Sequence, residues 1–372
     1  MPDSTRLKLF QSAFDFSESQ VRRMVEKYPD YYPMYTKDGR WGRDRERIPR
    51  WTEGFLPGMM WIFYRKTGDP WWRNEAERYT TRLEPRKFDP DIHDHGYLFL
   101  ASYGRWAVMQ PSEAVETVLR EAAETLAKRF RPKGEYLCSY MGADSLFIDI
   151  MMNVGLLFRV AKQTGDARIR DIALRHVRTS LSHLVRSDGS TAQEALFNLE
   201  TGEFLRHATH QGLRPDTCWS RGQVWGLYGF GSAARHTGEV AFLDAAERCA
   251  DYFLAHLPPE RVPWWDFHVP EGERRIHDSS AAAAAASGLL NLAKLARSGA
   301  RQKAYREGAL QILAALSAPP FLARGVEGQE GILLHGVYHY HKGWAVDESL
   351  AWGDYFFVEA LAKVLGVEEE LL

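Results

Sequence analysis

The sequence predicts an all-α protein of the (α/α)6 barrel class, with six inner and six outer helices. Six stretches are apolar nearly all round, stretches with one apolar stripe alternate with them, and a turn that contains Gly recurs between helices. A helix that is apolar on every side is buried, whereas a helix with one apolar stripe covers a core. The natural closed arrangement of such pairs is a double ring of helices rather than an open solenoid.

The stretches that are apolar all round are predicted to be the inner helices. They begin at Gly54, Gly96, Leu146, Gly222, Ala281 and Glu348. The outer helices are expected near residues 17–29, 70–83, 115–126, 166–184, 242–253 and 301–316. In two of these, apolar residues follow the i, i+3, i+4, i+7 spacing of an amphipathic helix, as in Val115, Val118, Leu119, Ala122 and Leu126.

Glycine turns divide the helical stretches. They are Thr67-Gly68-Asp69, Thr164-Gly165-Asp166, Thr237-Gly238-Glu239 and, more loosely, Ser298-Gly299. Glycine is expected to close each helix in the left-handed conformation, and the next helix then begins with an acidic first turn. A strand hairpin is expected around residues 190–203, which have turn residues at both ends. Because no linker rich in Pro, Gly or Ser occurs, residues 1–372 are predicted to form a single domain.

The composition excludes several classes of function. The 47 basic residues are balanced by 49 acidic ones, and no basic block is present, so nucleic acid is not an expected partner. No secretory leader and no run of about 18 apolar residues occurs, so we expect a cytoplasmic protein without a membrane partner. Cys138, Cys218 and Cys249 are widely spaced, which indicates neither a disulfide framework nor a thiolate metal site. A monomer or homodimer is expected.

The segment of residues 210–226 is the most informative part of the chain. Trp219 and Trp225 bracket Arg221, and His210 and Gln211 lie just upstream. Indole faces stack on sugar rings, and a guanidinium can hold the planar carboxylate of a uronic acid through two parallel hydrogen bonds. The segment therefore predicts a site for an acidic sugar. The structural alternative is a cation–π pair between Arg221 and Trp225, one helical turn apart.

Two aspartates are candidates for acid and base chemistry. Asp149 lies in an apolar run, where Ser145, Asp149 and Asn153 are spaced four apart and would share one helix face. The alternative is that Asp149 caps a neighbouring loop. Asp94 either caps the helix that begins beside it or faces Asp149. If the two carboxyls meet, burial and repulsion raise the pKa of one of them, which can then act as a general acid.

Other catalytic chemistry has weaker support. His93 and His95 flank Asp94, and His335, His339 and His341 lie close together in sequence, but no HExxH motif occurs. We therefore expect no catalytic metal. The chain also lacks a GxSxG nucleophile elbow, and Cys218 has no activating partner in the sequence.

The chain resembles the unsaturated glucuronyl hydrolases of glycoside hydrolase family 88 over about residues 45–365. The blocks that carry the resemblance are WTEGFLPGMMW from Trp51, HDHGY from His93, FIDIMMN from Phe147, DGST from Asp188, HQGLRPDTCWSRGQVWG from His210, DSSAAAAAASGLL from Asp278 and DESLAWGDYFFVEAL from Asp347. The resemblance implies an (α/α)6 barrel enzyme that needs no cofactor. Its substrates would be small oligosaccharides left by polysaccharide lyases, such as glycosaminoglycan fragments, with a 4,5-unsaturated glucuronate at the non-reducing end.

The resemblance also implies a role for each site residue. Asp149 would protonate C4 of the vinyl ether and then accept a proton from the water that adds at C5, while Asp94 would position Asp149 and the water. The residues implied to bind the sugars are Arg221, His210, Gln211, Trp51, Trp219, Trp225, Tyr338 and Gln193. Gln193 stands where the family has His, which leaves substrate preference open. The chain ends VEEELL without the Ser and Lys expected for sulfated disaccharides, so such a preference is not expected.

Two alternatives stay open from the sequence. An unsaturated rhamnogalacturonyl hydrolase of family 105, acting on pectin fragments, would share the barrel and a related hydration. A sugar epimerase or a non-catalytic uronate-binding barrel would belong to a different class, since an epimerase inverts saturated sugars through His acid/base pairs.

Overall fold

The computed structural model describes residues 4–42 and 51–367, which form two compact units. The terminal unit comprises the described residues of Met1–Tyr79, His256–Trp265 and Val269–Glu370, and the central unit comprises Thr80–Ala255 with Asp266–His268. That residues 1–372 form a single domain stays a prediction. Residues 368–372, on which the expectation about sulfated sugars rests, lie outside the described residues.

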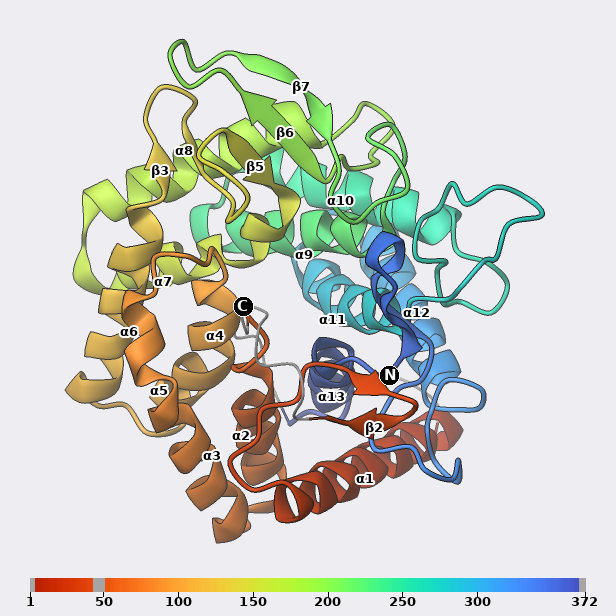
Figure 1. The fold of residues 1–372 in the computed structure, drawn as a ribbon. Coiled ribbons are helices and arrows are strands. Elements are labelled where there is room, and N and C mark those ends of the chain that lie inside the picture. Colours follow the sequence, from red (N-terminus) through yellow and green to blue (C-terminus); the bar gives the residue numbers. More distant parts are fainter. Residues whose placement is uncertain (1–3, 43–50, 368–372) are drawn as a thin grey trace. The chain divides into compact units, whose positions relative to one another are not determined.

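The terminal unit is mainly helical (Figure 1). Its elements are α1 (Ser4–Lys27), β1 (Thr36–Lys37), β2 (Arg40–Trp41), α2 (Phe55–Thr67), most of α3 (Pro70–Arg82), α11 (Ser279–Leu295), α12 (Gly299–Leu316), β8 (Gly336–His339), the short 3₁₀ helix η4 (Tyr340–Lys342), β9 (Trp344–Glu348) and α13 (Ala351–Val364). Helices α1, α2, α11 and α12 all contact α13. This makes α13 the centre of the unit, and twelve of its fourteen residues, from Ala351 to Ala362, are buried without interruption.

The central unit contains a second set of helices and an antiparallel sheet of order β5-β6-β7. Its elements are η1 (Glu84–Phe88), α4 (His95–Phe99), the π-helix η2 (Leu100–Gly104), α5 (Arg105–Met109), α6 (Glu113–Ala127), β3 (Phe130–Arg131), β4 (Tyr136–Leu137), β5 (Ser145–Phe147), the 3₁₀ helix η3 (Ile148–Met152), α7 (Val154–Thr164), α8 (Ala167–Leu184), β6 (Glu194–Phe197), β7 (Phe204–Ala208), α9 (Ser220–Thr237) and α10 (Val240–Ala255). Helix α9 contacts α7, α10 and η3. Strand β6 of this sheet contacts α8 (Figure 1).

The alternation of buried and amphipathic helices agrees with the prediction. Among the described residues, six helical stretches are buried on most sides: α2, the continuous stretch α4-η2-α5, α7, α9, α11 and α13. Alternating with them in sequence, starting before α2, the helices α1, α3, α6, α8, α10 and α12 each bury one face and expose the other. The sequence pattern therefore located all six helix pairs.

Three of the four glycine helix ends are confirmed, but the acidic first turns expected after them are wrong, because α3, α8 and α10 have no acidic residue in their first turn. Gly68, Gly165 and Gly238 have φ of 70°, 75° and 73° and end α2, α7 and α9. The backbone N–H of each donates to the carbonyl four residues earlier, which satisfies one terminal acceptor. The expectation for Ser298-Gly299 is wrong, because Ser298 begins α12: its Oγ accepts a hydrogen bond from the Arg301 N–H.

Two expected helices differ from the structure. The N-terminal helix begins at Ser4 rather than near residue 17, and Phe10, Ala13 and Phe14 give its added turns a buried face. The inner helix expected from Leu146 begins only at Val154, after β5 and η3. In an apolar run this short, burial alone does not distinguish a strand from a helix.

The predicted helix face of Ser145, Asp149 and Asn153 is therefore wrong. Ser145 lies in β5 and donates to Glu194 Oε1 at 2.6 Å, Asp149 lies in η3, and Asn153 precedes α7. The expected strand hairpin occurs as β6 and β7, but its second strand, Phe204–Ala208, lies beyond residues 190–203, and β5 adds a third strand.

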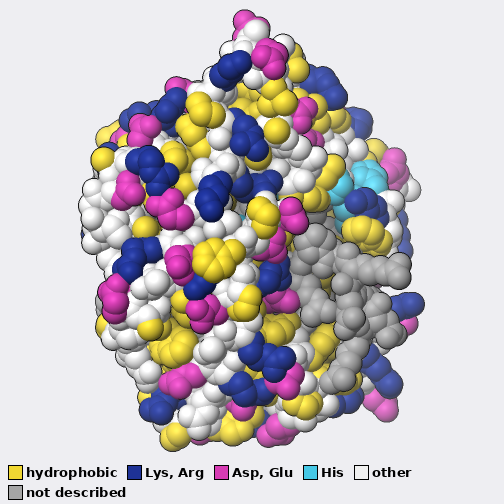
Figure 2. Space-filling view, turned by 60° about the vertical axis from the view of Figure 1, so that its left-hand side comes forward, with side chains coloured by type: hydrophobic (Ala, Val, Ile, Leu, Met, Phe, Trp, Pro, Cys, Tyr) yellow, Lys and Arg dark blue, Asp and Glu magenta, His cyan; other side chains and the backbone are white. Residues whose placement is uncertain are grey.

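The surface drawn in Figure 2 has no large area of one charge. Lys and Arg side chains alternate with Asp and Glu side chains across that face. None of the described helices is long and apolar enough to span a bilayer.

Candidate active site

Asp149 is held at a break between a strand and a 3₁₀ helix. Ile148 and Ile150 on either side are fully buried, whereas Asp149 is half-buried. The Ile148 N–H donates to the Gln193 carbonyl at 2.9 Å, which anchors the segment to the sheet. On the other side, η3 packs against α9, where a Cβ at Gly229 would lie 2.5 Å from Met151 Cβ. These contacts fix the backbone that carries the Asp149 carboxyl.

Asn153 joins the Asp149 segment to the Asp94 segment. Its Nδ2 donates to the Asp149 carbonyl at 3.2 Å, and its Oδ1 accepts a hydrogen bond from the Tyr97 N–H at 2.9 Å. Gly96 permits this approach, because a Cβ there would lie 2.4 Å from Asn153 Cα. The HDHGY and FIDIMMN blocks therefore meet through Gly96 and Asn153.

Asp94 occupies the N-cap position of α4 but its side chain makes no capping hydrogen bond. It is 8% exposed, and its Oδ1 lies 3.3 Å from His93 Nε2. His93 Nδ1 accepts a hydrogen bond from the Tyr140 N–H at 3.1 Å. This contact fixes the ring orientation and leaves Nε2 as the nitrogen that carries a proton toward Asp94. Asp94 is thus held by a histidine instead of by helix amides.

The pKa of Asp149 is raised to about 6. Burial is the largest cause, and the charge of Asp94 raises the pKa further, while His93 and Arg221 lower it. The Oδ2 atom of Asp149 is buried and makes no hydrogen bond to the described residues. A carboxyl with this pKa is partly protonated near neutral pH and can donate a proton to a substrate. The two aspartates interact electrostatically, as expected from the sequence.

Arg221 and its neighbouring tryptophans lie at the start of α9. The Arg221 guanidinium lies 4.5 Å above the Trp219 ring, which makes Trp219 a cation–π partner of Arg221. Arg221 is 1% exposed and contributes to the electrostatics of Asp149. Trp225 is also buried, and its ring packs edge to face with Tyr97 at 5.5 Å. The start of α9 thus places a cation and two indoles with the Asp149 segment in the central unit.

The loop of residues 209–212 brings Gln193, His210 and Gln211 together. Gln193 Oε1 accepts hydrogen bonds from the N–H groups of His210 and Gln211, both at 2.7 Å. The His210 ring lies 6.4 Å from the Phe147 ring, two residues before Asp149. Gln193, His210 and Gln211 belong to the central unit. So do five more of the ten predicted site residues, and only Trp51 and Tyr338 of the ten do not.

Trp51 and Tyr338 belong to the terminal unit. Their ring centroids lie 6.5 Å apart, and both contact the Trp352 ring. Both side chains are half-buried. Their role in sugar stacking stays a prediction.

The histidines and cysteines do not form a metal centre. Within residues 4–42 and 51–367, no three His, Cys, Asp or Glu side chains come together as a metal-binding group. Cys218 is fully buried, burial raises the pKa of its thiol, and its Sγ donates to Gln223 Oε1 at 3.2 Å. This environment opposes a thiolate nucleophile.

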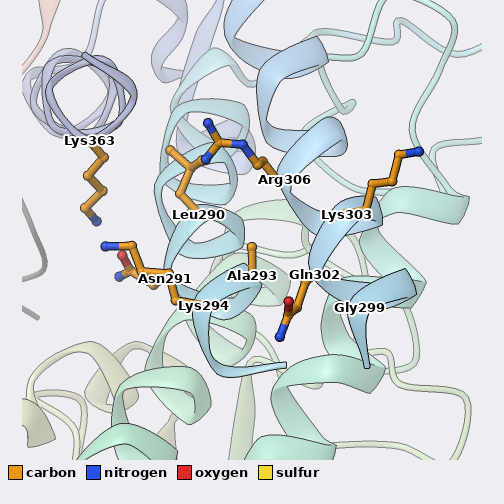
Figure 3. A pocket seen from close by; sticks show the side chains of 9 residues that line it. All are labelled: Leu290, Asn291, Ala293, Lys294, Gly299, Gln302, Lys303, Arg306 and Lys363. Atoms are coloured by element: carbon orange, nitrogen blue, oxygen red, sulfur yellow. The ribbon is translucent and has the colours of Figure 1, made fainter. Parts of the chain in front are cut away.

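A separate hollow of about 360 Å³ lies along α11 and α12 in the terminal unit (Figure 3). Its basic lining residues are Lys294, Lys303, Arg306 and Lys363. Lys363 Nζ already donates to Ser287 Oγ at 2.7 Å and to Glu359 Oε2 at 3.2 Å, and Figure 3 shows Lys303 pointing away from the other side chains. None of the predicted site residues lines this hollow.

Two supporting residues were missed in the sequence. His93 was considered only as a metal ligand, although it contacts Asp94. Asp266, which is fully buried, accepts hydrogen bonds from the Leu213 N–H at 2.9 Å and the Thr217 hydroxyl at 2.8 Å. The sequence carries a signal for His93, its place next to Asp94, but none for Asp266, which lies 53 residues from Leu213.

Known proteins resemble this chain over nearly its whole length. An unsaturated glucuronyl hydrolase from Bacillus sp. (strain GL1) is 32% identical, with 96% of this chain and 97% of the relative covered. An unsaturated chondroitin disaccharide hydrolase from Streptococcus pyogenes serotype M1 is 31% identical, with 94% and 90% covered. The crystal structure of the unsaturated glucuronyl hydrolase from Bacillus sp. GL1, described as responsible for the degradation of glycosaminoglycan, matches with a TM-score of 0.90 at 31% identity, covering 95% of this chain and 96% of that one.

These similarities confirm the predicted fold class and the predicted family. The six helix pairs occur in the expected order, and the structural match extends over nearly the whole chain. The model of Glycosyl Hydrolase Family 88 matches residues 16–257, which include Asp94, Asp149 and Arg221. The chain belongs to glycosyl hydrolase family 88.

Proposed function

We propose that this protein removes a 4,5-unsaturated glucuronate from the non-reducing end of small oligosaccharides produced by polysaccharide lyases. Its family and its relatives, named for unsaturated glucuronyl and unsaturated chondroitin disaccharide substrates, support this substrate class. The reaction is a hydration of the vinyl ether rather than a displacement at the glycosidic carbon. A cytoplasmic location and a monomeric or homodimeric state belong to the same proposal.

Asp149 carries the proton transfers in this proposal. Its protonated carboxyl donates a proton to C4, and the ring oxygen stabilises the positive charge that develops at C5. Water adds to C5 and returns its proton to the Asp149 carboxylate, which restores the starting state. The hemiketal formed at C5 then opens, and the neighbouring sugar leaves. No proton or electron is gained or lost by the enzyme over the cycle.

One observation carries the proposal: the Asp149 carboxyl has a pKa near 6 and a buried Oδ2 without a hydrogen-bond partner among the described residues. A fully ionised carboxylate could not protonate carbon, and a carboxyl bonded to the protein through both oxygens could not reach a substrate. Asp94, held by His93, raises the pKa of Asp149, which gives it a tuning role.

The neighbouring residues suit the anionic sugar. Arg221 supplies a buried guanidinium for the uronate carboxylate, with Trp219 beneath it. His210 and Gln211 add donors from the adjoining loop. Trp225 is buried against Tyr97, so its proposed contribution is one face of an aromatic wall.

The test is a panel of unsaturated disaccharides from chondroitin, hyaluronan, heparin, gellan and pectin, followed by loss of the alkene absorbance. Cleavage of unsaturated glucuronyl disaccharides by the wild type, abolished in Asp149→Asn with binding retained, supports the proposal. Cleavage only of the pectin-derived rhamnogalacturonyl substrate would assign the rival hydrolase instead. Inversion of a saturated sugar without cleavage would assign an epimerase.

A further inference from the structure

Gln193 has an unusually complete set of hydrogen bonds for an uncharged side chain. Its Oε1 accepts from the Thr209 hydroxyl and from the N–H groups of His210 and Gln211, each at 2.7 Å, and from the Gly212 N–H at 3.4 Å. Three of these donors are main-chain N–H groups, and of the two ends of the Gln193 amide only the oxygen can accept from them. The orientation of the Gln193 amide is therefore fixed by the loop that surrounds it.

The other half of the Gln193 amide acts on Gln211. Gln193 Nε2 donates to Gln211 Oε1 at 3.0 Å, and both residues are buried. Because this bond uses the oxygen of Gln211, the NH₂ group is the half of the planar Gln211 amide that lies on the side away from Gln193. This bond assigns the donor half of the Gln211 amide, and an NH₂ donor is the half that suits the carboxylate and hydroxyl oxygens of a uronic acid.

From this arrangement we infer that Gln193 is a positioning residue: it fixes the side-chain amide of Gln211 as a hydrogen-bond donor and acts on the substrate through Gln211 rather than by direct contact. The inference rests on the proposed function for the identity of the ligand. It differs from the role that the family resemblance implies for position 193, which is contact with the substrate.

The contact between Gln193 and the Asp149 segment is made by the main chain of Gln193, whereas the contact with Gln211 is made by its side chain. The Gln193 carbonyl accepts from the Ile148 N–H at 2.9 Å, and a side-chain substitution leaves this bond in place. The far end of the loop is held independently, because Leu213 and Thr217 bond to Asp266. A change in the Gln193 side chain should therefore alter binding more than the proton transfers.

The experiment uses Gln193→Glu and Gln193→Leu, each made in the wild type and in Gln211→Ala, with an unsaturated disaccharide as substrate. A Glu carboxylate still accepts from the loop amides but cannot donate to Gln211 Oε1, so the Gln211 amide loses its fixed orientation. We expect Gln193→Glu to raise KM about tenfold, with kcat changed by less than about threefold. In the Gln211→Ala background the same substitution should change KM by less than about twofold, because the residue through which it acts is gone.

The opposite pattern overturns the inference. If Gln193→Glu raises KM by the same factor in both backgrounds, Gln193 contacts the substrate directly. If it lowers kcat with KM unchanged, it acts on the chemistry. Failure of the inference can be distinguished from failure of the proposed function, because the proposed function fails only if the wild type is inactive on the whole panel.

The thermal unfolding midpoints of the two Gln193 variants test the loop contacts without any activity. Leu leaves the amides of His210 and Gln211 and the hydroxyl of Thr209 without their acceptor. Gln193→Leu should therefore unfold at a lower temperature than Gln193→Glu. Equal midpoints would contradict the positioning role.

Discussion

Gly96 lies against the backbone of Asn153 so closely that a Cβ on Gly96 would sit 2.4 Å from Asn153 Cα. Because Gly96 follows Asp94 by two residues and Asn153 follows Asp149 by four, this contact sets how closely the two aspartate segments approach. The absence of a side chain at Gly96 is thus a condition for the electrostatic coupling of the two carboxyls.

Gly96→Ala should separate the two segments. Backbone must move to admit the methyl group, which we expect to cost about 3 kcal/mol of unfolding free energy and to lower kcat/KM about 100-fold. The matched control is Gly104→Ala in the same helical stretch, where the nearest heavy atom would lie 3.5 Å from the new Cβ, an ordinary contact. Urea denaturation measures the unfolding free energy, and loss of the alkene absorbance measures kcat/KM. Equal unfolding free energies and equal kcat/KM values for the two variants would contradict this account of Gly96.

The wild-type pH profile should show the protonation state of Asp149. Since the acid form donates the proton, kcat/KM should fall as pH rises through about 6, the pKa to which burial raises this carboxyl. Initial rates between pH 4 and 9 measure it. A profile that stays flat from pH 5 to 8 would exclude this carboxyl as the titrating acid.

Substitutions at Asp94 and His93 should shift the alkaline limb of the pH profile, where kcat/KM falls as pH rises, in opposite directions. Asp94 raises the pKa of Asp149 and His93 lowers it. Asp94→Asn should therefore shift the limb to lower pH, and His93→Gln should shift it to higher pH. Shifts in the same direction would show that the two residues do not act on Asp149 electrostatically.

Asp149→Asn should stabilise the protein at alkaline pH. The folded-state pKa of Asp149 is raised from 3.8 to about 6, so its contribution to stability is present below pH about 4 and is lost as pH rises through 6. An Asn side chain does not titrate, so the variant does not lose stability in this way as pH rises. The variant should gain up to about 3 kcal/mol over the wild type by pH 8, with little difference at pH 4. Urea denaturation across this range checks it, and a gain that does not depend on pH would contradict it.

Arg221→Lys should weaken substrate binding although the charge is kept. Lysine cannot form two parallel hydrogen bonds to a carboxylate or stack as a plane on Trp219. We expect KM to rise at least tenfold, equivalent to about 1.4 kcal/mol. Arg235→Lys, in the last turn of the same helix, is the control and should leave KM unchanged. Equal KM values for Arg221→Lys and the wild type would remove Arg221 from carboxylate binding.

The sequence was most informative where local patterns determine the structure. The periodicity of apolar residues located all six helix pairs, and the glycines at 68, 165 and 238 marked three helix ends. The motif blocks predicted Asp94, Asp149 and Arg221 as site residues, and all three lie in the central unit. Short-range features of this kind depend on neighbouring residues only.

Features that depend on distant partners could not be predicted. Strand β5 forms because Phe147 pairs with Glu194, so the apolar run at Asp149 does not continue as a helix. The hydrogen bonds of Gln193 join residues 16 to 19 positions away, and those of Asp266 join residues 49 and 53 positions away. No local pattern around either residue indicates these contacts.

The central claim is that Asp149 delivers a proton to C4, and the most direct measurement is the reaction in deuterated water, with the product followed by NMR. The account predicts one deuterium at C4 in every product molecule formed by the wild type, and no product from Asp149→Asn. Product without deuterium at C4, or normal turnover by Asp149→Asn, would contradict it.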